Sequence, residues 1–359
     1  MNSLRQRLDH LLRGRLRTAV AAALAGLLIG ATVTAWQTDA FASDDSFCWG
    51  ALDQSDVTAL FHTPKNVKSA ELPVVNSDLS TGNLNGSCRL SRRTWQVTAT
   101  AHQLSSQYGG ASGLWADEFL SARLTPLGGG LSGMASDTRA WLALPEDCTG
   151  DIDAYEGPDV VDLAMGSANP GHKVDPEDRA AMARAVVKLV NRVIADQGCR
   201  GTVADPSGHL PAVPAYLDEK PGDLCGIKGL ALTSNQRKDT DLGRALVAGG
   251  TGPVRTCEFT SPSGRPRLRL MTVTDPHLAG IYYNTLLYGG TRIENTMGSG
   301  IVRPDLAAFR ADCQTGRTLF LVQTEDSRQA ATVKALLPRY AAAEATRIGC
   351  GPPRITVPR

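Results

Sequence analysis

The segment VIADQGC (residues 193–199) ends a predicted amphipathic helix with a Gly–Cys pair, and ATRIGC (345–350) ends a second predicted helix in the same way. A strand is predicted before each helix, and a further cysteine, Cys148 or Cys313, precedes that strand. A helix that returns antiparallel across its strand brings its last residues back to the start of the strand, and glycine allows the turn that ends the helix. We therefore predict that each of these cysteines forms a disulfide with the cysteine that ends its helix.

All eight cysteines follow the apolar N-terminal segment. An even set of cysteines in an oxidising compartment is typical of disulfides. Zinc is the competing interpretation, but the chain has no Cys-x-x-Cys and no Cys/His cluster at ligand spacing. The order of the cysteines predicts no metal site and four disulfides, Cys48–Cys88, Cys148–Cys199, Cys225–Cys257 and Cys313–Cys350.

The sequence segments around the first four cysteines recur in the same order around the last four, which predicts a tandem duplication. SCRLSRRTWQVTATAH (87–102) corresponds to TCEFTSPSGRPRLRLMTVTDPH (256–277), and the opening and closing segments also correspond. These units are longer than solenoid repeats, so each is expected to be a domain. We predict an extracytoplasmic domain at 44–200, a proline-rich linker at 201–222 and a second extracytoplasmic domain at 223–352.

The repeated unit reads as a mixture of strands and helices. Trp95, Val97 and Ala99 alternate with polar residues, as in a strand of a sheet that has one face exposed to solvent. Asp175 precedes a long helix as its cap. The expected fold class is α+β, with two tandem duplicated domains, each a small antiparallel sheet with helices packed on it and two disulfides, after one N-terminal transmembrane helix.

The N-terminus predicts membrane targeting. Residues 1–17 are rich in arginine and form an expected basic cytoplasmic tail, and the apolar residues 18–36 form either a transmembrane anchor or the core of a signal peptide. The positive charge predicts an N-terminus in the cytoplasm and a bulk outside it. The protein is then a single-pass cell-membrane protein or, after cleavage following Ala42, a secreted one. No lipobox precedes Cys48.

Charge and motifs limit the function. The net charge is +1 and no basic stripe follows the N-terminal segment, which argues against nucleic-acid binding. The chain contains no His-Glu-x-x-His, Gly-x-Ser-x-Gly, P-loop or dinucleotide fingerprint, so it predicts no catalytic residues and no cofactor. GGGLSG (128–133) lacks a lysine and is interpreted as a turn.

Three weaker features are candidates for binding. His102 and His277 follow corresponding strands and can form a metal-binding or pH-sensing pair, although solvated strand-end histidines are the simpler interpretation. Trp115 lies in a short amphipathic segment and is a candidate for contact with a partner. The acidic segment 147–159 offers oxygen ligands, but its spacing differs from a calcium-binding loop, and a solvated loop is the simpler interpretation.

The segment DSFCWGAL (45–52), the paired cysteine sets and the alanine- and arginine-rich text resemble uncharacterised actinobacterial secreted or membrane-anchored proteins with tandem four-cysteine domains. Cys257-Glu258-Phe259 is also distantly similar to small actinobacterial lipoprotein domains, in which a second cysteine opens a strand with an aromatic residue. The resemblance covers most of residues 44–350 and implies no activity and no functional residues.

Together these observations predict a membrane-anchored extracytoplasmic protein that is not an enzyme but a binding or scaffold module of the cell envelope. The expected partners are the membrane and an envelope protein or ligand of unknown identity. The alternative is a secreted hydrolase with an unrecognised active site. A third interpretation is a sensor whose basic tail contacts a cytoplasmic partner.

Overall fold

A computed structural model describes residues 46–63, 65–76, 84–103, 120–149, 158–165, 174–218, 220, 222–240, 244–250, 252–260, 266–280, 282, 286, 289–324, 326–351 and 353–358. Residues Phe47–Arg359 form one compact unit. The predicted apolar segment 18–36 and the cleavage site after Ala42 lie outside the described residues. Among the helices that are described, none has the length and apolar character needed to cross a membrane.

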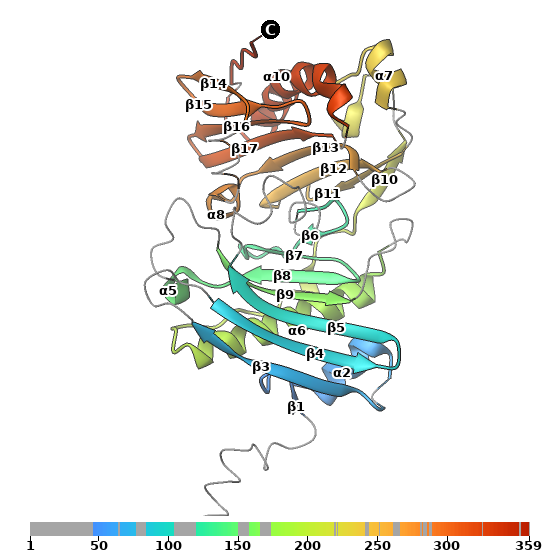
Figure 1. The fold of residues 1–359 in the computed structure, drawn as a ribbon, viewed down its shortest axis with the longest axis vertical. Coiled ribbons are helices and arrows are strands. Elements are labelled where there is room, and N and C mark those ends of the chain that lie inside the picture. The colour runs from blue at the N-terminus through green and yellow to red at the C-terminus, as the bar shows by residue number, and fades with distance from the viewer. Residues whose placement is uncertain are drawn as a thin grey trace, which may run out of the picture. The chain divides into compact units, whose positions relative to one another are not determined.

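The first half contains a seven-stranded antiparallel sheet, called here the N-terminal sheet, with the strand order β3-β4-β5-β9-β8-β7-β6 (Figure 1). Its strands are β3 (Lys68–Asn76), β4 (Leu84–Arg92), β5 (Trp95–Gln103), β6 (Thr125–Pro126), β7 (Gly133–Ala135), β8 (Arg139–Ala143) and β9 (Asp159–Met165). A two-stranded sheet of β1 (Ser46–Phe47) and β2 (Leu52–Asp53) precedes it. The helices of this half are α2 (Gln54–Phe61), α5 (Glu146–Thr149) and α6 (Pro176–Asp196).

The second half contains an eight-stranded antiparallel sheet, the C-terminal sheet, with the order β10-β11-β12-β13-β17-β16-β15-β14. Its strands are β10 (Ala215–Asp218), β11 (Arg244–Ala248), β12 (Val254–Thr260), β13 (Pro266–Val273), β14 (Thr291–Asn295), β15 (Gly298–Val302), β16 (Leu306–Cys313) and β17 (Gly316–Gln323). The α-helices are α7 (Ser234–Thr240), α8 (Pro276–Gly280) and α10 (Ala330–Arg347), and the 3-10 helices are Ser207–His209, Leu224–Gly226 and Ser327–Gln329.

The two sheets share a strand order. From β11 to β14 the C-terminal sheet repeats the sequence of connections that runs from β3 to β6 in the N-terminal sheet, and β10 is an additional edge strand. β10 pairs with β11 and lies within the range 201–222 that was predicted to be a linker. The corresponding strands β4 and β12 carry Cys88 and Cys257.

Local sequence explains the predicted elements that the structure contains. In β5, Val97, Ala99 and Ala101 are buried while Thr98 and Thr100 between them are partly exposed. Helix α6 begins after Asp175, whose side chain accepts hydrogen bonds from two backbone N–H groups of the first turn. Gly198 follows this helix with φ +70°, a conformation that costs glycine little.

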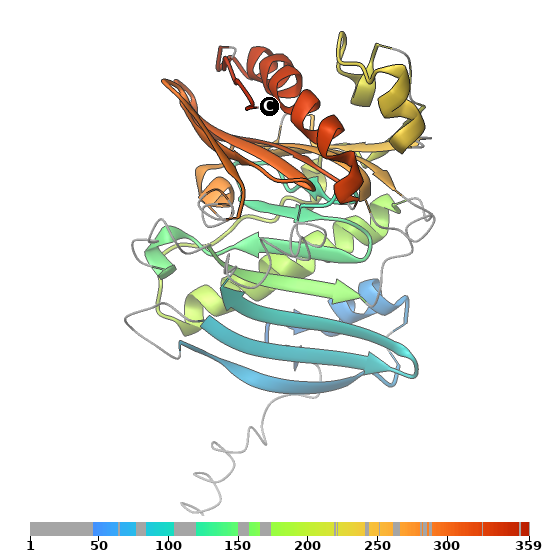
Figure 2. The ribbon, with the colours of Figure 1, turned by 45° about the horizontal axis from the view of Figure 1, so that its top comes forward.

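Three apolar clusters hold the sheets and helices together. Helices α2 and α6 pack on one face of the N-terminal sheet, and α10 packs on one face of the C-terminal sheet (Figure 2). A third cluster joins the two sheets, with Trp141 and Val160 from the first half and Met271 and Leu321 from the second. Thr256 also donates a hydrogen bond to the carbonyl oxygen of Leu120 across these halves.

The predicted α+β fold class is wrong, because the described chain is mostly β-structure in two large sheets. The prediction interpreted GGGLSG (128–133) as a turn, whereas Gly133 begins strand β7, and β6, β14 and β15 were not predicted as strands. Gly133 and Gly300 occupy strand positions where a Cβ atom would collide with a backbone carbonyl of the neighbouring strand. Glycine therefore marks close strand packing at these positions rather than a loop.

The prediction that the cysteines form disulfides is confirmed. Within the described chain no cysteine is free, and the four bonds join the pairs predicted from the cysteine order: Cys48–Cys88, Cys148–Cys199, Cys225–Cys257 and Cys313–Cys350. Their sequence separations run from 32 to 51 residues, so each closes a long loop of the chain.

Candidate functional site

A pocket of about 250 Å³ lies on the side of the N-terminal sheet that α2 and α6 cover. Its walls come from the end of α2, the β4–β5 hairpin, the β7–β8 turn, the end of β9 and the first turns of α6. The apolar lining residues are Ala59, Leu60, Phe61, Trp95, Met165 and Met182, and the polar ones are His62, Arg92, Asp137, Thr138 and Asp178.

The backbone turns that border the pocket position its side chains. His62 caps the end of α2 in a left-handed conformation, with φ +56°. Arg93 adopts the same region with φ +52° in the turn between β4 and β5, on either side of which Arg92 and Trp95 pair with each other. Both turns use a non-glycine residue at positive φ, an uncommon conformation.

The apolar wall combines a buried base with an exposed rim. Met182 is 1% exposed, whereas Trp95 is 61% exposed although it is one of the largest apolar side chains of the protein. Phe61 and Met165 are partly buried between these extremes. An aromatic side chain exposed beside a pocket is well suited to contact a bound molecule.

Asp178 and His62 form an ion pair at the polar wall. Their Oδ1 and Nε2 atoms are 3.3 Å apart, and the side chains are 35% and 73% exposed. Burial raises the pKa of Asp178 above its usual value of 3.8, and the nearby carboxylates Asp175, Asp137 and Glu177 raise it further against the opposing effect of His62. Burial is therefore the main cause of the shift, and the three carboxylates add to it.

Asp137 is the most deeply buried acid of the pocket, with 5% of its surface exposed. It lies in the β7–β8 turn, where the Ser136 hydroxyl accepts hydrogen bonds from the backbone N–H groups of Thr138 and Arg139. Oδ2 of Asp137 accepts a long hydrogen bond of 3.4 Å from the backbone N–H of Asp175. Among the described residues, none donates a hydrogen bond to its Oδ1 atom.

A separate charged cluster fixes α2 against α6 beside the pocket. Nζ of Lys188 lies 2.7 Å from Oδ2 of Asp56 and 3.0 Å from Oδ2 of Asp53. A hydrogen bond from Ser55, followed by that from Lys188, lowers the pKa of Asp53 well below its usual range. Although burial opposes it, the hydrogen bonds to Asp56 and Asp53 raise the pKa of Lys188. The helices that form two walls of the pocket are therefore held by charge-assisted hydrogen bonds.

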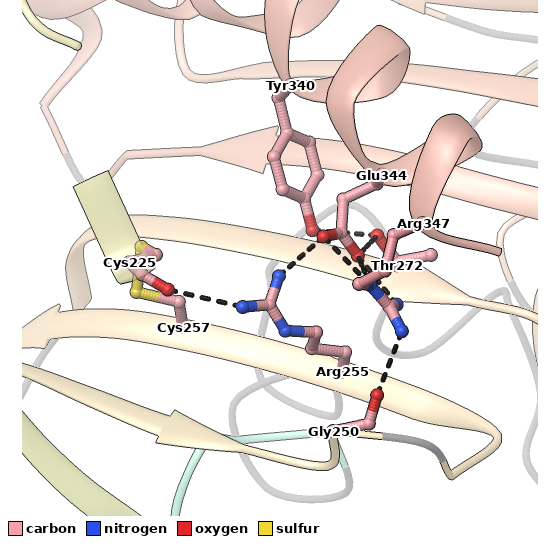
Figure 3. A network of polar contacts seen from close by, with 8 residues as sticks. All are labelled: Cys225, Gly250, Arg255, Cys257, Thr272, Tyr340, Glu344 and Arg347. Atoms are coloured by element: carbon pink, nitrogen blue, oxygen red, sulfur yellow. Dashed lines mark hydrogen bonds and ion pairs between the residues drawn. A yellow bond between two sulfur atoms is a disulfide. The ribbon is translucent and has the colours of Figure 1, made fainter. Parts of the chain in front are cut away.

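The C-terminal sheet carries a different polar cluster beneath α10 (Figure 3). The Glu344 carboxylate, 1% exposed, receives hydrogen bonds from Arg255 at 2.5 Å, Thr272 at 3.0 Å and Arg347 at 2.8 Å. The hydroxyl groups of Tyr340 and Thr272 lie 2.8 Å apart. Burial, followed by the charge of Glu344, raises the pKa of Tyr340.

The two arginines of this cluster also bind the surrounding backbone. Arg255 donates to the carbonyl oxygen of Cys225 and Arg347 to that of Gly250 (Figure 3). The cluster therefore ties α10 to the sheet and to the Cys225–Cys257 disulfide. Because its carboxylate is fully hydrogen-bonded, this cluster has the character of a structural support.

The structure does not bring the predicted candidate residues together in this pocket. His102 lies near the end of β5, with Nδ1 3.2 Å from the carbonyl oxygen of Gln103, and does not line the pocket. His277 belongs to α8, and its side chain is outside the described atoms. Trp115 and the acidic positions 151–157 lie outside the described residues.

The pocket residues were not predicted as a site. Of the residues in and around it, Asp175 was predicted only as a helix cap and Trp95 only as part of a strand. The involvement of His62 and Asp137 depends on tertiary packing.

The lining offers carboxylates, an imidazole, a hydroxyl, a guanidinium and an aromatic surface for contact with a bound molecule. In the part of the chain that the structure describes, no group of three or more His, Cys, Asp or Glu side chains is placed to hold a metal ion. No family model, curated protein or solved structure matches this chain.

Proposed function

We propose that the protein is a binding module of the cell envelope and that the pocket of the N-terminal sheet is its ligand site. The observation that carries this proposal is the combination of an exposed Trp95, an apolar base and the incompletely hydrogen-bonded Asp137 in one cavity. Pockets with an apolar lining and a few convergent polar groups are the usual form of small-molecule sites.

The four disulfides support a location outside the cytoplasm, since such bonds persist in oxidising compartments. We retain the single-pass anchor at 18–36 and secretion after Ala42 as the two routes to this location. The shared strand order of the sheets supports an internal duplication, in which the first copy carries the ligand site.

The His62–Asp178 pair supports a hydrolase as the second candidate function. An imidazole oriented by a carboxylate is the arrangement that general bases use. Thr138 is the one hydroxyl side chain among the lining residues. A hydrolase predicts that a bound ester is cleaved and that His62→Ala stops the cleavage, whereas a binding module predicts that ligands are recovered unchanged.

Methionine methyl NMR of the full-length protein tests the proposed site. Met165 and Met182 line the pocket, whereas Met134 and Met271 lie in the cluster between the sheets. The protein, labelled at the methionine methyl carbons, is titrated separately with benzylamine, benzyl alcohol and benzoate. We expect at least one compound to shift the signals of Met165 and Met182 and to leave those of Met134 and Met271 in place.

Failure has a clear form in this experiment. If none of the three compounds moves the two pocket signals, or if all four methionine signals move alike, the pocket is not a small-molecule site. A Trp95→Ala variant provides the matching control, because it removes the exposed aromatic wall and retains both pocket methionines.

A further inference from the structure

We propose that the pocket recognises an organic cation, an ammonium or guanidinium group attached to an apolar or aromatic body. This inference rests on the proposed function of the same pocket and names its ligand class. It requires that the pocket provide acceptors for the cation, an excess of negative charge, and an apolar surface of matching size.

The first requirement is met by Asp137. A buried carboxylate whose Oδ1 atom receives no hydrogen bond from the described residues is costly for the folded protein. Its other oxygen accepts only the long bond from the backbone of Asp175. Asp137 lines the pocket although its Oδ1 atom is shielded from solvent, so its negative charge attracts a cationic group bound there and repels an anionic one.

The second requirement concerns the charge around Asp137. Asp175, Glu177 and Asp178 precede or begin α6, and all contribute negative charge near the pocket. The positive end of the helix dipole compensates part of this charge. His62 supplies the opposing charge for Asp178 when it is protonated.

Arg92 is the other basic residue of the lining, and its Nε atom donates a hydrogen bond to the carbonyl oxygen of Lys65 at 3.1 Å. This bond directs part of its guanidinium toward the backbone. No ion pair joins Arg92 to Asp137 or Asp178 within the described residues. The carboxylates of the pocket therefore have capacity for an additional cation.

The third requirement is met by the aromatic rim. A cation placed over the face of a tryptophan is attracted by the electrons of the ring. Trp95 is 61% exposed beside the pocket, and Phe61 extends the same wall. The volume of about 250 Å³ limits the bound part to a small group such as a benzylammonium ion or the end of a basic side chain.

The test compares three probes of similar size that differ in charge: benzylamine, benzyl alcohol and benzoate. The full-length protein is titrated at pH 7, and dissociation constants are taken from the shifts of Met165 and Met182. We expect benzylamine, which is protonated at this pH, to bind at least about tenfold more tightly than benzyl alcohol and benzoate to bind most weakly. The variant Asp137→Asn should weaken benzylamine binding about tenfold and leave benzyl alcohol binding unchanged.

Asp312→Asn is the matched control, because it removes one carboxylate at an exposed position of β16 that does not line the pocket. It should leave the affinity for benzylamine unchanged. The signals of Met134 and Met271 report whether each variant is folded. If Asp137→Asn does not fold, Asp178→Asn provides the second test, with an expected weakening of a few fold.

Two outcomes overturn the inference, and they differ from the failure of the proposed function. If benzyl alcohol or benzoate shifts the pocket signals as tightly as benzylamine does, the pocket binds small molecules but does not select cations. If benzylamine binds equally well to the wild type and to the Asp137→Asn and Asp178→Asn variants, the carboxylates do not recognise it. Failure of all three probes instead contradicts the proposed site itself.

Discussion

Helices α6 and α10 follow strands at matching positions of the two sheets, yet they cover very different polar groups. Under α10, Glu344 receives hydrogen bonds from two arginines and a threonine. At the start of α6, Asp137 has one long hydrogen bond from the described residues, beside a pocket and an exposed tryptophan. The same architecture thus holds a fully hydrogen-bonded carboxylate in one half and an incompletely hydrogen-bonded one in the other. The first supports the structure, whereas the second lines a pocket that can bind a ligand.

The disulfides should behave as equals in the two halves. Cys48–Cys88 and Cys225–Cys257 close loops of 40 and 32 residues and anchor corresponding strands. Replacing both cysteines of either bond by serine should lower the free energy of unfolding by about 4 kcal/mol in the chain-entropy model. Urea denaturation of the full-length protein measures this loss. A large loss for one pair with almost none for the other contradicts the equivalence of the two sheets.

The next largest effect concerns the satisfied carboxylate. Glu344→Ala leaves Arg255 and Arg347 without their shared acceptor in a buried setting. We expect the free energy of unfolding to fall by about 3 kcal/mol. This is a small loss for a broken buried ion pair, because Arg347 is 36% exposed. Asp178→Ala at the start of α6 is the control, with an expected loss below about 1 kcal/mol for an exposed pair. Equal losses in urea denaturation would remove the contrast between the two helices.

Local patterns explain what could be predicted of the fold. The structure contains the alternation in β5, the cap of α6 and the disulfides expected from the cysteine order. The first two depend on a few neighbouring residues, and the third depends on a spacing that repeats along the chain. The extent of the sheets was missed because strand glycines such as Gly133, which was interpreted as part of a turn, and Gly300 carry no strand pattern of their own. Their role follows from the approach of a neighbouring strand, which no local pattern records.

The unsatisfied carboxylate predicts an unusual gain of stability. Asp137→Asn replaces a buried group that lacks a hydrogen bond on Oδ1 with a neutral amide. We expect the free energy of unfolding to rise by about 1 kcal/mol, since the desolvation of the carboxylate is removed while the contact with Asp175 can remain. Thermal and urea unfolding at pH 7 measure the change. A loss of stability comparable to that of Glu344→Ala would identify Asp137 as structural support instead.

The site illustrates the limit of sequence-based prediction more sharply than the fold does. Asp175 and Asp178 carry the signature of a helix start, and that interpretation is correct as far as it goes. Their association with His62 and Asp137 brings together segments more than 35 residues apart in the chain. Such a pocket depends on the packing of α2 and α6 on the sheet, so its residues become recognisable only after folding.

The smallest expected effect is the pH dependence of Asp178. Its pKa lies above the usual 3.8 because of burial and the charges of Asp175, Asp137 and Glu177, although His62 opposes the shift. The folded protein therefore binds this proton more readily than the unfolded chain does. Stability from this group is present at low pH and falls as the pH rises from the usual value through the folded pKa.

Ligand binding should change in the opposite direction. As the pH falls from 7 toward 4, protonation of Asp178 removes a carboxylate from the pocket, so the affinity for benzylamine should decrease a few fold, beginning at a higher pH than for an ordinary aspartate. Titrations at several pH values measure this, and Asp178→Asn should weaken the dependence, which keeps the contribution of His62, while Asp312→Asn should leave it unchanged. If the unfolding free energy of the wild type relative to Asp178→Asn does not fall across the same pH window, Asp178 does not carry the shifted proton. The incompletely hydrogen-bonded carboxylate of Asp137 would then be the one remaining difference between the polar groups of the pocket and those under α10.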